Sequence, residues 1–304
     1  MAPGVVQDVC TTRDSALLEQ ISDDVDVVNV LKDKMTANGS QSSEADKSKF
    51  RQYDDACDRV KSFYKEQHEK QTVAYNLKAR FAFRSKIRSR MTIWEAIEKL
   101  NTLIDESDPD TSLSQIHHLI QSAEAIRNDG KPRWMQLVGL IHDLGKLLYF
   151  FDAEGQWDVV GDTFPVGCAF DPRIIYPETF ARNPDSTNEI YSTKFGIYYP
   201  KCGLSNIMLS WGHDEYLYNV VKDQSTIPEE GLAMIRYHSF YPWHKEGAYT
   251  EFMDENDFKM LEAVREFNPY DLYSKSDQVP NIDDVKPYYL ELIDEFFPSQ
   301  VINW

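Results

Sequence analysis

Residues 134–150 read WMQLVGLIHDLGKLLYF, an apolar stretch in which a histidine stands next to an aspartate. Its leucines and isoleucine recur at helical spacing, which predicts one buried helix over the whole stretch. A buried carboxylate is costly unless a cation or hydrogen bonds compensate its charge. A metal ion beside His142 and Asp143 is the simplest compensation.

The segments on either side also have helical spacing and lack the alternation typical of strands. Helices are predicted over 53–83, 92–104, 112–127, 204–221, 226–241, 256–267 and 285–297. The second of these begins with a capping box, Thr92-Ile93-Trp94-Glu95. Residues 151–202 are rich in Gly, Pro and Asp and are expected to be irregular, with a short strand or two. The fold class is therefore all α, with few or short strands.

The composition limits the domain organisation and the partners. With 304 residues, 42% of them hydrophobic, the chain can bury one sizeable core. We predict a single domain over 49–304, preceded by an acidic, flexible extension over 1–48. The net charge of −18 argues against nucleic acid or an anionic membrane surface as a partner. Because there is neither a secretory signal nor an apolar run of ~20 residues, we expect a cytoplasmic protein.

Histidines and aspartates near the middles or ends of the predicted helices form the candidate metal ligands. They are His118, His142, Asp143, His213, His238 and Asp271. The four cysteines form no CxxC pair, so nitrogen and oxygen ligands are expected, which suit iron, manganese or zinc. Six ligands exceed what one ion that must also bind substrate would use, so two metals are implied. Asp143 is expected to bridge them, since adjacent helical residues point about 100° apart.

Several assignments stay open at this point. His117 competes with His118 as the first ligand, and Asp271 could instead cap a helix. Asp214 and Glu215 are interpreted as carboxylates that do not bind the metal. Lys146 follows Asp143 by three residues and so lies on the same helical face, where its ammonium is expected to contact a substrate oxygen.

Five segments together resemble the myo-inositol oxygenase family, which belongs to the HD-domain superfamily and has a di-iron centre. They are LVGLIHDLGK at 137–146, VGDTFPVGC at 160–168, SWGHDEY at 210–216, YHSFYPWH at 237–244, and VREFN at 264–268 with DLY at 271–273. The resemblance covers about residues 50–304. It implies an HD-domain-like helical bundle around a dinuclear metal site, and it favours His118 over His117.

The resemblance also implies a role for each site residue. One iron would be held by His118, His142 and Asp271, the other by His213 and His238, with Asp143 between them. Asp143 and Lys146 would be catalytic. The implied substrate contacts are Arg51, Asp105, Glu106, Ser107, Lys146, Gly161, Asp162 and Ser239.

The implied reaction is cleavage of the C1–C6 bond of myo-inositol by O2 to give D-glucuronate at an Fe(II)/Fe(III) pair. All four electrons come from the substrate, so neither nicotinamide nor flavin is needed, and no GxGxxG follows a strand. We expect a monomer whose partners are myo-inositol and O2. One alternative is an HD-type metal-dependent phosphohydrolase, for which Lys146 is almost the sole phosphate-binding cation. Another is a catalytically silent, metal-stabilised scaffold.

Overall fold

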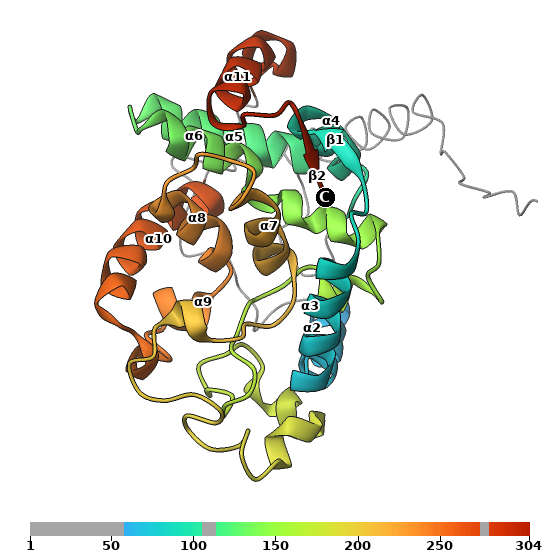
Figure 1. The fold of residues 1–304 in the computed structure, drawn as a ribbon, viewed down its shortest axis with the longest axis vertical. Helices are drawn as coiled ribbons and strands as arrows, with labels where there is room; N and C mark the ends of the chain where they lie inside the picture. Colours follow the sequence, from blue (N-terminus) through green and yellow to red (C-terminus); the bar gives the residue numbers. More distant parts are fainter. Residues whose placement is uncertain (1–57, 105–113, 274–279) are drawn as a thin grey trace, which may run out of the picture.

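The structure is a computed structural model that describes residues 58–104, 114–273 and 280–304 (Figure 1). The predicted extension over 1–48 lies outside these residues, as do four predicted substrate contacts: Arg51, Asp105, Glu106 and Ser107. Most of the described chain is helical and its strands are short. The all-α prediction is confirmed.

The elements follow one another in this order along the chain. The α-helices are α2 (Asp58–Lys70), α3 (Val73–Ser85), α4 (Ile93–Leu100), α5 (Gln115–Asn128), α6 (Arg133–Ile141), α7 (His213–Val221), α8 (Glu229–Tyr237), α9 (Tyr241–His244), α10 (Glu255–Tyr273) and α11 (Ile282–Phe296). The 3₁₀ helices are η2 (His142–Phe150), η3 (Gln156–Asp158), η4 (Pro177–Arg182), η5 (Pro184–Thr187), η6 (Leu204–Asn206) and η7 (Thr250–Phe252). The strands are β1 (Arg90–Thr92) and β2 (Val301–Asn303).

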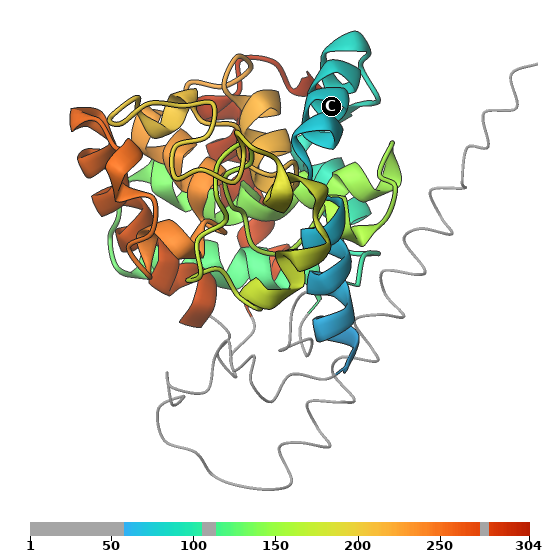
Figure 2. The same ribbon diagram turned by 90° about the horizontal axis from the view of Figure 1, so that it is seen from below.

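The central element is η2, which packs against α4, α6, α7 and α8. Around it, α2 and α3 lie along one side of the molecule, and α8 and α10 along the opposite side (Figures 1 and 2). Helices α5 and α6 pack closely because residue 139 is glycine. The Cβ of an alanine there would lie 2.7 Å from Ile126 Cδ1 and 3.0 Å from Ala123 Cα.

The start of α4 is fixed by its sequence. The Thr92 side chain accepts a hydrogen bond from the Glu95 N–H, and the Glu95 carboxylate accepts one from the Thr92 N–H, so the predicted capping box is confirmed. Just before it, β1 pairs antiparallel with β2, with Met91 opposite Ile302. This pairing joins the last residues of the chain to the core, where Trp304 is buried.

The helix predicted over 53–83 is two helices in the structure, with a break between Lys70 and Val73. Thr72 starts a new helix there, because its hydroxyl accepts a hydrogen bond from the Tyr75 N–H. Side chains at the break and in the first turn of α3 also bind a distant backbone: Gln71 donates to the Trp211 carbonyl and Asn76 accepts from the Trp211 N–H. The prediction of one continuous helix was wrong, since these partners lie far away in the sequence.

The helix predicted over 134–150 changes type in its middle, where α6 gives way to the 3₁₀ helix η2 at His142. The imidazole Nδ1 of His142 donates to the Gly139 carbonyl, which the Asp143 N–H would use in a continued α-helix. In a 3₁₀ helix residues i and i+3 are eclipsed, so Asp143 and Lys146 lie directly above one another. The prediction was right about burial and wrong about helix type.

Two further helices are shorter than predicted. The stretch 204–212 does not form the first part of the helix predicted over 204–221, because it pairs with residues 164–166: Ser210 N–H donates to the Phe164 carbonyl and Val166 N–H to the Met208 carbonyl. The helix predicted over 226–241 begins only after Pro228 and ends at Tyr237. By contrast, α10 is longer than predicted, because it extends beyond residue 267 and includes Asp271.

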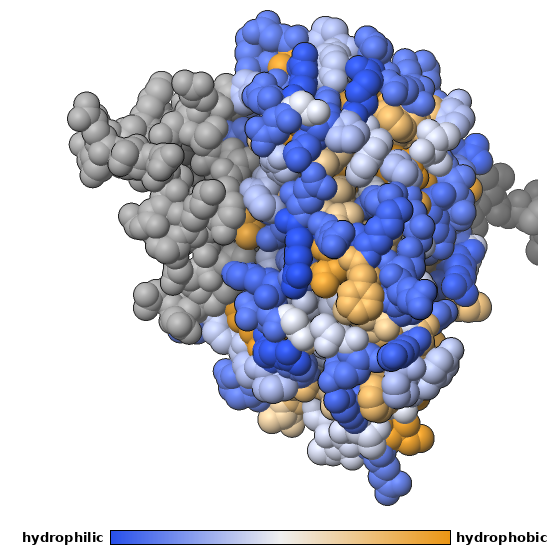
Figure 3. Space-filling model, turned by 90° about the vertical axis from the view of Figure 1, so that its left-hand side faces the viewer, coloured by the Kyte–Doolittle hydropathy of each residue, from blue (hydrophilic) through white to orange (hydrophobic). Residues whose placement is uncertain are grey.

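The buried apolar side chains of the described residues form two clusters. The larger joins α2, α4 to α8, α11 and β2, and the smaller lies among residues 164–180, 202–209 and α9 to α10. The face shown in Figure 3 is mostly hydrophilic, with apolar side chains in small groups. Within the described part of the chain, no helix has both the length and the apolarity to cross a bilayer.

The smaller cluster contacts a buried histidine that gives a pH-dependent stability. His68 stacks on Phe180, and burial lowers its pKa from 6.5 to about 3. The folded state therefore binds fewer protons than the unfolded state between these values. The contribution of His68 to the free energy of unfolding should be fully present above pH 6.5. It should fall by up to about 1.4 kcal/mol per pH unit as the pH drops towards 3.

We expect His68→Phe to remove this contribution to the pH dependence. Urea unfolding at several pH values between 6.5 and 4 measures the slope of the unfolding free energy for both proteins. Thr179→Val is the control, because it removes the hydroxyl 2.6 Å from His68 Nδ1 but keeps the titrating imidazole. Equal slopes in His68→Phe and in the wild type would contradict the assignment.

Candidate metal centre

The six predicted ligands converge on one buried place, although they come from five elements. His118 lies on α5, His142 and Asp143 begin η2, His213 begins α7, His238 is the C-cap residue directly after α8, and Asp271 lies in the last turn of α10. None of these six side chains is more than 14% exposed. A central 3₁₀ helix surrounded by α-helices thus brings together residues that are far apart in sequence.

The carboxylate of Asp143 lies between two groups of histidines. Its Oδ2 is 3.7 Å from the Nε2 atoms of both His118 and His142. Its Oδ1 is 3.6 Å from the Nε2 atoms of both His213 and His238. Each oxygen of one carboxylate therefore faces its own pair of imidazoles, which is the arrangement of a bridging ligand.

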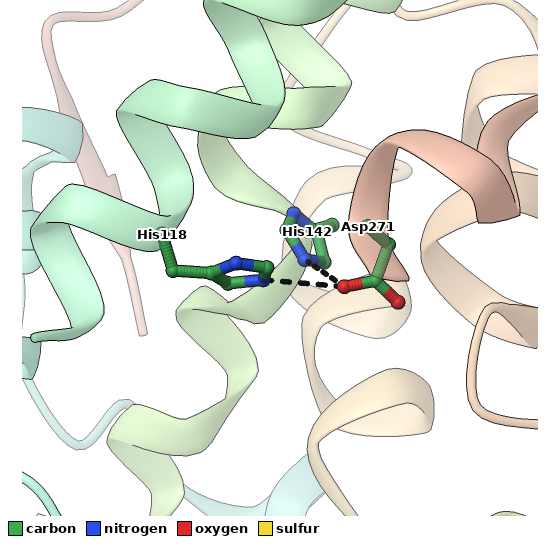
Figure 4. Close-up of side chains that lie close together, drawn as sticks. All are labelled: His118, His142 and Asp271. Atoms are coloured by element: carbon green, nitrogen blue, oxygen red, sulfur yellow. Dashed lines mark hydrogen bonds and ion pairs between the residues drawn. The ribbon is translucent and has the colours of Figure 1, made fainter. Parts of the chain in front are cut away.

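We call His118, His142 and Asp271 the first pole of the site (Figure 4). One oxygen of Asp271, Oδ1, lies 3.2 Å from His118 Nε2 and 3.3 Å from His142 Nε2. Ligand atoms this close to one another can bind a single ion. The helix-cap interpretation of Asp271 was wrong, since its carboxylate faces the two histidines from within α10.

We call His213 and His238 the second pole. Their Nε2 atoms are 3.3 Å apart. The side chain of His213 is held by the Val159 carbonyl, which lies 2.8 Å from Nδ1, and that of His238 by the Ile235 carbonyl, 3.0 Å from Nδ1.

The same kind of hydrogen bond fixes three of the four imidazoles. A carbonyl can only accept, so Nδ1 of His142, His213 and His238 must carry a proton. In the neutral imidazole this leaves the lone pair on Nε2, the atom that faces Asp143. Backbone contacts of this type orient metal-binding histidines. The three rings are therefore prepared to bind cations through Nε2.

The charges of the site also fit metal cations. Burial alone would raise the pKa of Asp143, but Lys146 and His142 hold it well below its usual range. Burial likewise acts against Asp271, whose pKa is held low by hydrogen bonds from His118 and His142. Asp143 and Asp271 in turn raise the pKa of His142 despite its complete burial. Buried carboxylates that attract protons onto nearby imidazoles would attract metal ions in the same way.

Lys146 contacts the Asp143 carboxylate. Its Nζ lies 2.8 Å from Asp143 Oδ2, on the side of the first pole. The sequence predicts a substrate oxygen beside this ammonium, and in the structure the Asp143 carboxylate lies beside it.

A close approach of two backbones holds η2 against α7. The Cβ of an alanine at position 145 would overlap the carbonyl oxygen of His213 and lie 2.6 Å from its carbonyl carbon. Glycine in the His142-Asp143-Leu144-Gly145-Lys146 run thus allows Asp143 and His213 to come together.

Of the predicted substrate contacts that the structure describes, Lys146 lies on the side of the first pole, whereas Ser239 lies beside the second pole and is linked to the segment that contains Gly161 and Asp162. Ser239 Oγ is 3.1 Å from His213 Nε2. The Ser239 carbonyl accepts a hydrogen bond from the N–H of Thr163, the residue that follows Gly161 and Asp162. Gly161 has φ +90°, and a side chain there would also meet Phe63, so glycine is required at this turn.

The structure distinguishes His118 from His117, which the sequence left as alternatives for the first ligand. His118 faces Asp143 and Asp271, whereas His117 lies with its Nδ1 3.0 Å from Ser114 Oγ. His118 is therefore the one brought to the site, as the resemblance implies.

Asp214, which the sequence analysis interprets as a carboxylate that does not bind the metal, lies directly beside the second pole. Its Oδ1 lies 2.8 Å from His213 Nε2 and 3.3 Å from His238 Nε2, closer to the second pole than Asp143. The sequence contains one sign of this position, because His213-Asp214 repeats the pair His142-Asp143. Glu215, which shared the same interpretation, instead forms a buried ion pair with Arg236 at 2.9 Å.

Comparison with known proteins gives one consistent result. A sequence model of the family described as myo-inositol oxygenase matches residues 57–304. The chain is 50% identical over 262 residues to inositol oxygenase 1 of Arabidopsis thaliana, covering 84% of each chain. It is 46% identical over 266 residues to the inositol oxygenase of Danio rerio, covering 86% of this chain and 95% of the relative. For the Rattus norvegicus inositol oxygenase the identity is 44% over 263 residues, with 85% and 92% covered.

Proposed function

This chain belongs to the myo-inositol oxygenase family, and we propose that it cleaves the C1–C6 bond of myo-inositol with O2 to give D-glucuronate. The position of the Asp143 carboxylate, 3.6 to 3.7 Å from two pairs of imidazoles, is the observation that carries the proposal. It supports a pair of metal ions rather than one. The match over residues 57–304 also supports treating 49–304 as one catalytic domain.

We propose iron in the Fe(II)/Fe(III) state as the cofactor. Within the described residues the free cysteines, Cys168 and Cys202, pack in the smaller apolar cluster and not at the site. The ligands are thus imidazole and carboxylate, which suit iron, manganese and zinc, and reaction with O2 favours iron. When bound, the iron pair would acidify a substrate hydroxyl and exchange electrons with O2.

The chain's own residues would bind and orient the polyol. Asp162 is buried and accepts a hydrogen bond from the Tyr64 hydroxyl, while Ser239 lies beside the second pole. A site that binds hydroxyls through such groups rejects deoxy analogues, because its own polar atoms are then left unpaired. Arg51, Asp105, Glu106 and Ser107 are predicted to contact the substrate in the same way, and they lie outside the described residues. The cytoplasmic location, the monomeric state and the absence of nucleic acid partners stay predictions.

The proposal is tested with purified protein loaded with iron and, separately, with manganese. Consumption of O2 that depends on myo-inositol, with D-glucuronate as the product, is the expected result. Release of phosphate from nucleotides without O2 uptake would instead indicate the phosphohydrolase. Metal binding without either reaction would indicate the silent scaffold.

Lys146→Ala is expected to keep both metals and to lose turnover by about 100-fold or more. All six proposed ligands remain, whereas the ammonium beside Asp143 that would stabilise a substrate oxygen is removed. Metal analysis and inositol-dependent O2 uptake measure the two effects. The control is Lys78→Ala, at an exposed lysine paired with Glu154. Normal turnover in Lys146→Ala would show that this role is wrong.

A further inference from the structure

The carboxylate of Asp214 has more contacts at the site than the proposed function uses. It is 1% exposed and belongs to the first turn of α7. Its Oδ1 accepts a hydrogen bond from the Ser239 hydroxyl at 3.1 Å. Its Oδ2 accepts from the Ser239 N–H at 3.1 Å and from the Thr163 hydroxyl at 3.3 Å. One side chain thus receives both donors of Ser239.

The direction of these bonds decides what Ser239 can offer to a ligand. An ionised carboxylate only accepts, so the single hydroxyl proton of Ser239 is used by Asp214. His213 Nε2 lies 3.1 Å from Ser239 Oγ, and in the metal-loaded protein this atom would bind the ion, so it could not donate a hydrogen bond to Ser239 there. Ser239 Oγ is left with lone pairs and no proton on the side that faces the second pole.

We propose that Asp214 is a positioning residue, which commits the Ser239 hydroxyl to accept a hydrogen bond from a substrate hydroxyl beside the second pole. This inference rests on the proposed function, since it names the chemistry by which the site recognises a polyol. It predicts a preference at this position for a group that can donate a hydrogen bond. A carbonyl or an ether oxygen there would face the lone pairs of Ser239.

Asp214 also holds two parts of the site in register. The Ser239 N–H binds its Oδ2, and the Ser239 carbonyl accepts from the Thr163 N–H at 2.9 Å. Thr163 directly follows Gly161 and Asp162, two proposed substrate contacts. Because backbone donors cannot change roles, they fix which oxygen of the carboxylate faces the Ser239 hydroxyl.

This fixed orientation makes Asp214→Asn a sharp test. The amide must place its carbonyl oxygen where Oδ2 was, to accept the Ser239 N–H. Its NH₂ group then replaces Oδ1 and donates to Ser239 Oγ, so the Ser239 proton turns towards the substrate. The variant therefore reverses the polarity of Ser239 with almost no change in shape.

The experiment measures equilibrium binding of myo-inositol to the iron-loaded protein without O2, by calorimetry, together with the metal content of each protein. Asp214→Asn and Ser239→Ala are each expected to weaken binding by about 10- to 100-fold while metal content stays unchanged. Of the two single variants, one will bind myo-inositol more weakly, and the double variant should bind no more than about threefold more weakly than that one. The reason is that both changes act through one hydroxyl. Thr163→Val removes a donor to Oδ2 only and should stay within about threefold of the wild type.

The outcomes separate the possibilities. Loss of metal in Asp214→Asn would make Asp214 a metal ligand and overturn the inference, as would effects that simply add in the double variant. If Asp214→Asn does not fold, Ser239→Ala still decides, since unchanged inositol binding by that variant overturns the inference. If the wild type does not bind myo-inositol, the proposed function and this inference are overturned together. If the wild type binds but the effects of the two substitutions add independently, the inference alone is overturned.

Discussion

Asp143→Ala is expected to lose both metals and all measurable inositol-dependent O2 uptake. The two oxygens of this carboxylate face both pairs of histidines, so its removal takes a ligand from each pole. The change also leaves the Lys146 ammonium without the carboxylate 2.8 Å away, which adds an uncompensated positive charge where cations must bind. Metal affinity should fall by more than the roughly 100-fold that loss of a group outside the ligand set can cause.

Metal analysis after dialysis, followed by the O2 uptake assay, measures both losses. Glu154→Ala is the control, because it removes a carboxylate that pairs with exposed Lys78 at a distance from the site. That variant should keep two metals and normal turnover. Two metals retained by Asp143→Ala would contradict the bridging role.

Gly145→Ala is expected to destabilise the protein by about 3 kcal/mol or more, because it forces two packed backbones apart. The new methyl group would overlap the His213 carbonyl oxygen. That backbone cannot yield easily, since the His213 N–H and Nδ1 both bind the Val159 carbonyl at 2.7 and 2.8 Å. A shift of His213 would also disturb the second pole, so metal content should fall together with stability.

Chemical denaturation gives the free energy of unfolding, and metal analysis of the folded protein gives the effect on the site. The matched control is Gly130→Ala, where φ is +67° but nothing lies within 4 Å of the added Cβ. That change should cost only the backbone strain of about 1 kcal/mol. Equal losses in the two variants would mean that close packing at residue 145 does not matter.

Strong local patterns predicted the parts of the fold that they control. The capping box at Thr92 and the buried faces of the helices needed no information from elsewhere in the chain. The helix boundaries that were wrong depend on distant partners. The Trp211 backbone binds Asn76 in the first turn of α3, just after the break between α2 and α3, and Ser210 pairs with Phe164 where a helix was expected. Such hydrogen bonds compete with helix formation and leave no mark on the local sequence.

The site, like the fold, could be predicted from the local sequence only in part. The His142-Asp143 pair predicted a buried, charged centre, because an apolar setting makes such a pair costly without a cation. His213-Asp214 has the same local form, yet Asp143 faces four imidazoles whereas Asp214 accepts both donors of Ser239. Spacing along the chain cannot distinguish these roles, since they depend on which elements pack around each carboxylate.

The central claim is a pair of metal ions on the two sides of Asp143. Crystals of the iron-loaded protein, measured at the iron absorption edge, give an anomalous difference map that locates every iron. We predict two peaks per chain about 3.5 to 4 Å apart, one among His118, His142 and Asp271 and the other beside His213 and His238. A single peak, or iron bound away from Asp143, would contradict the account.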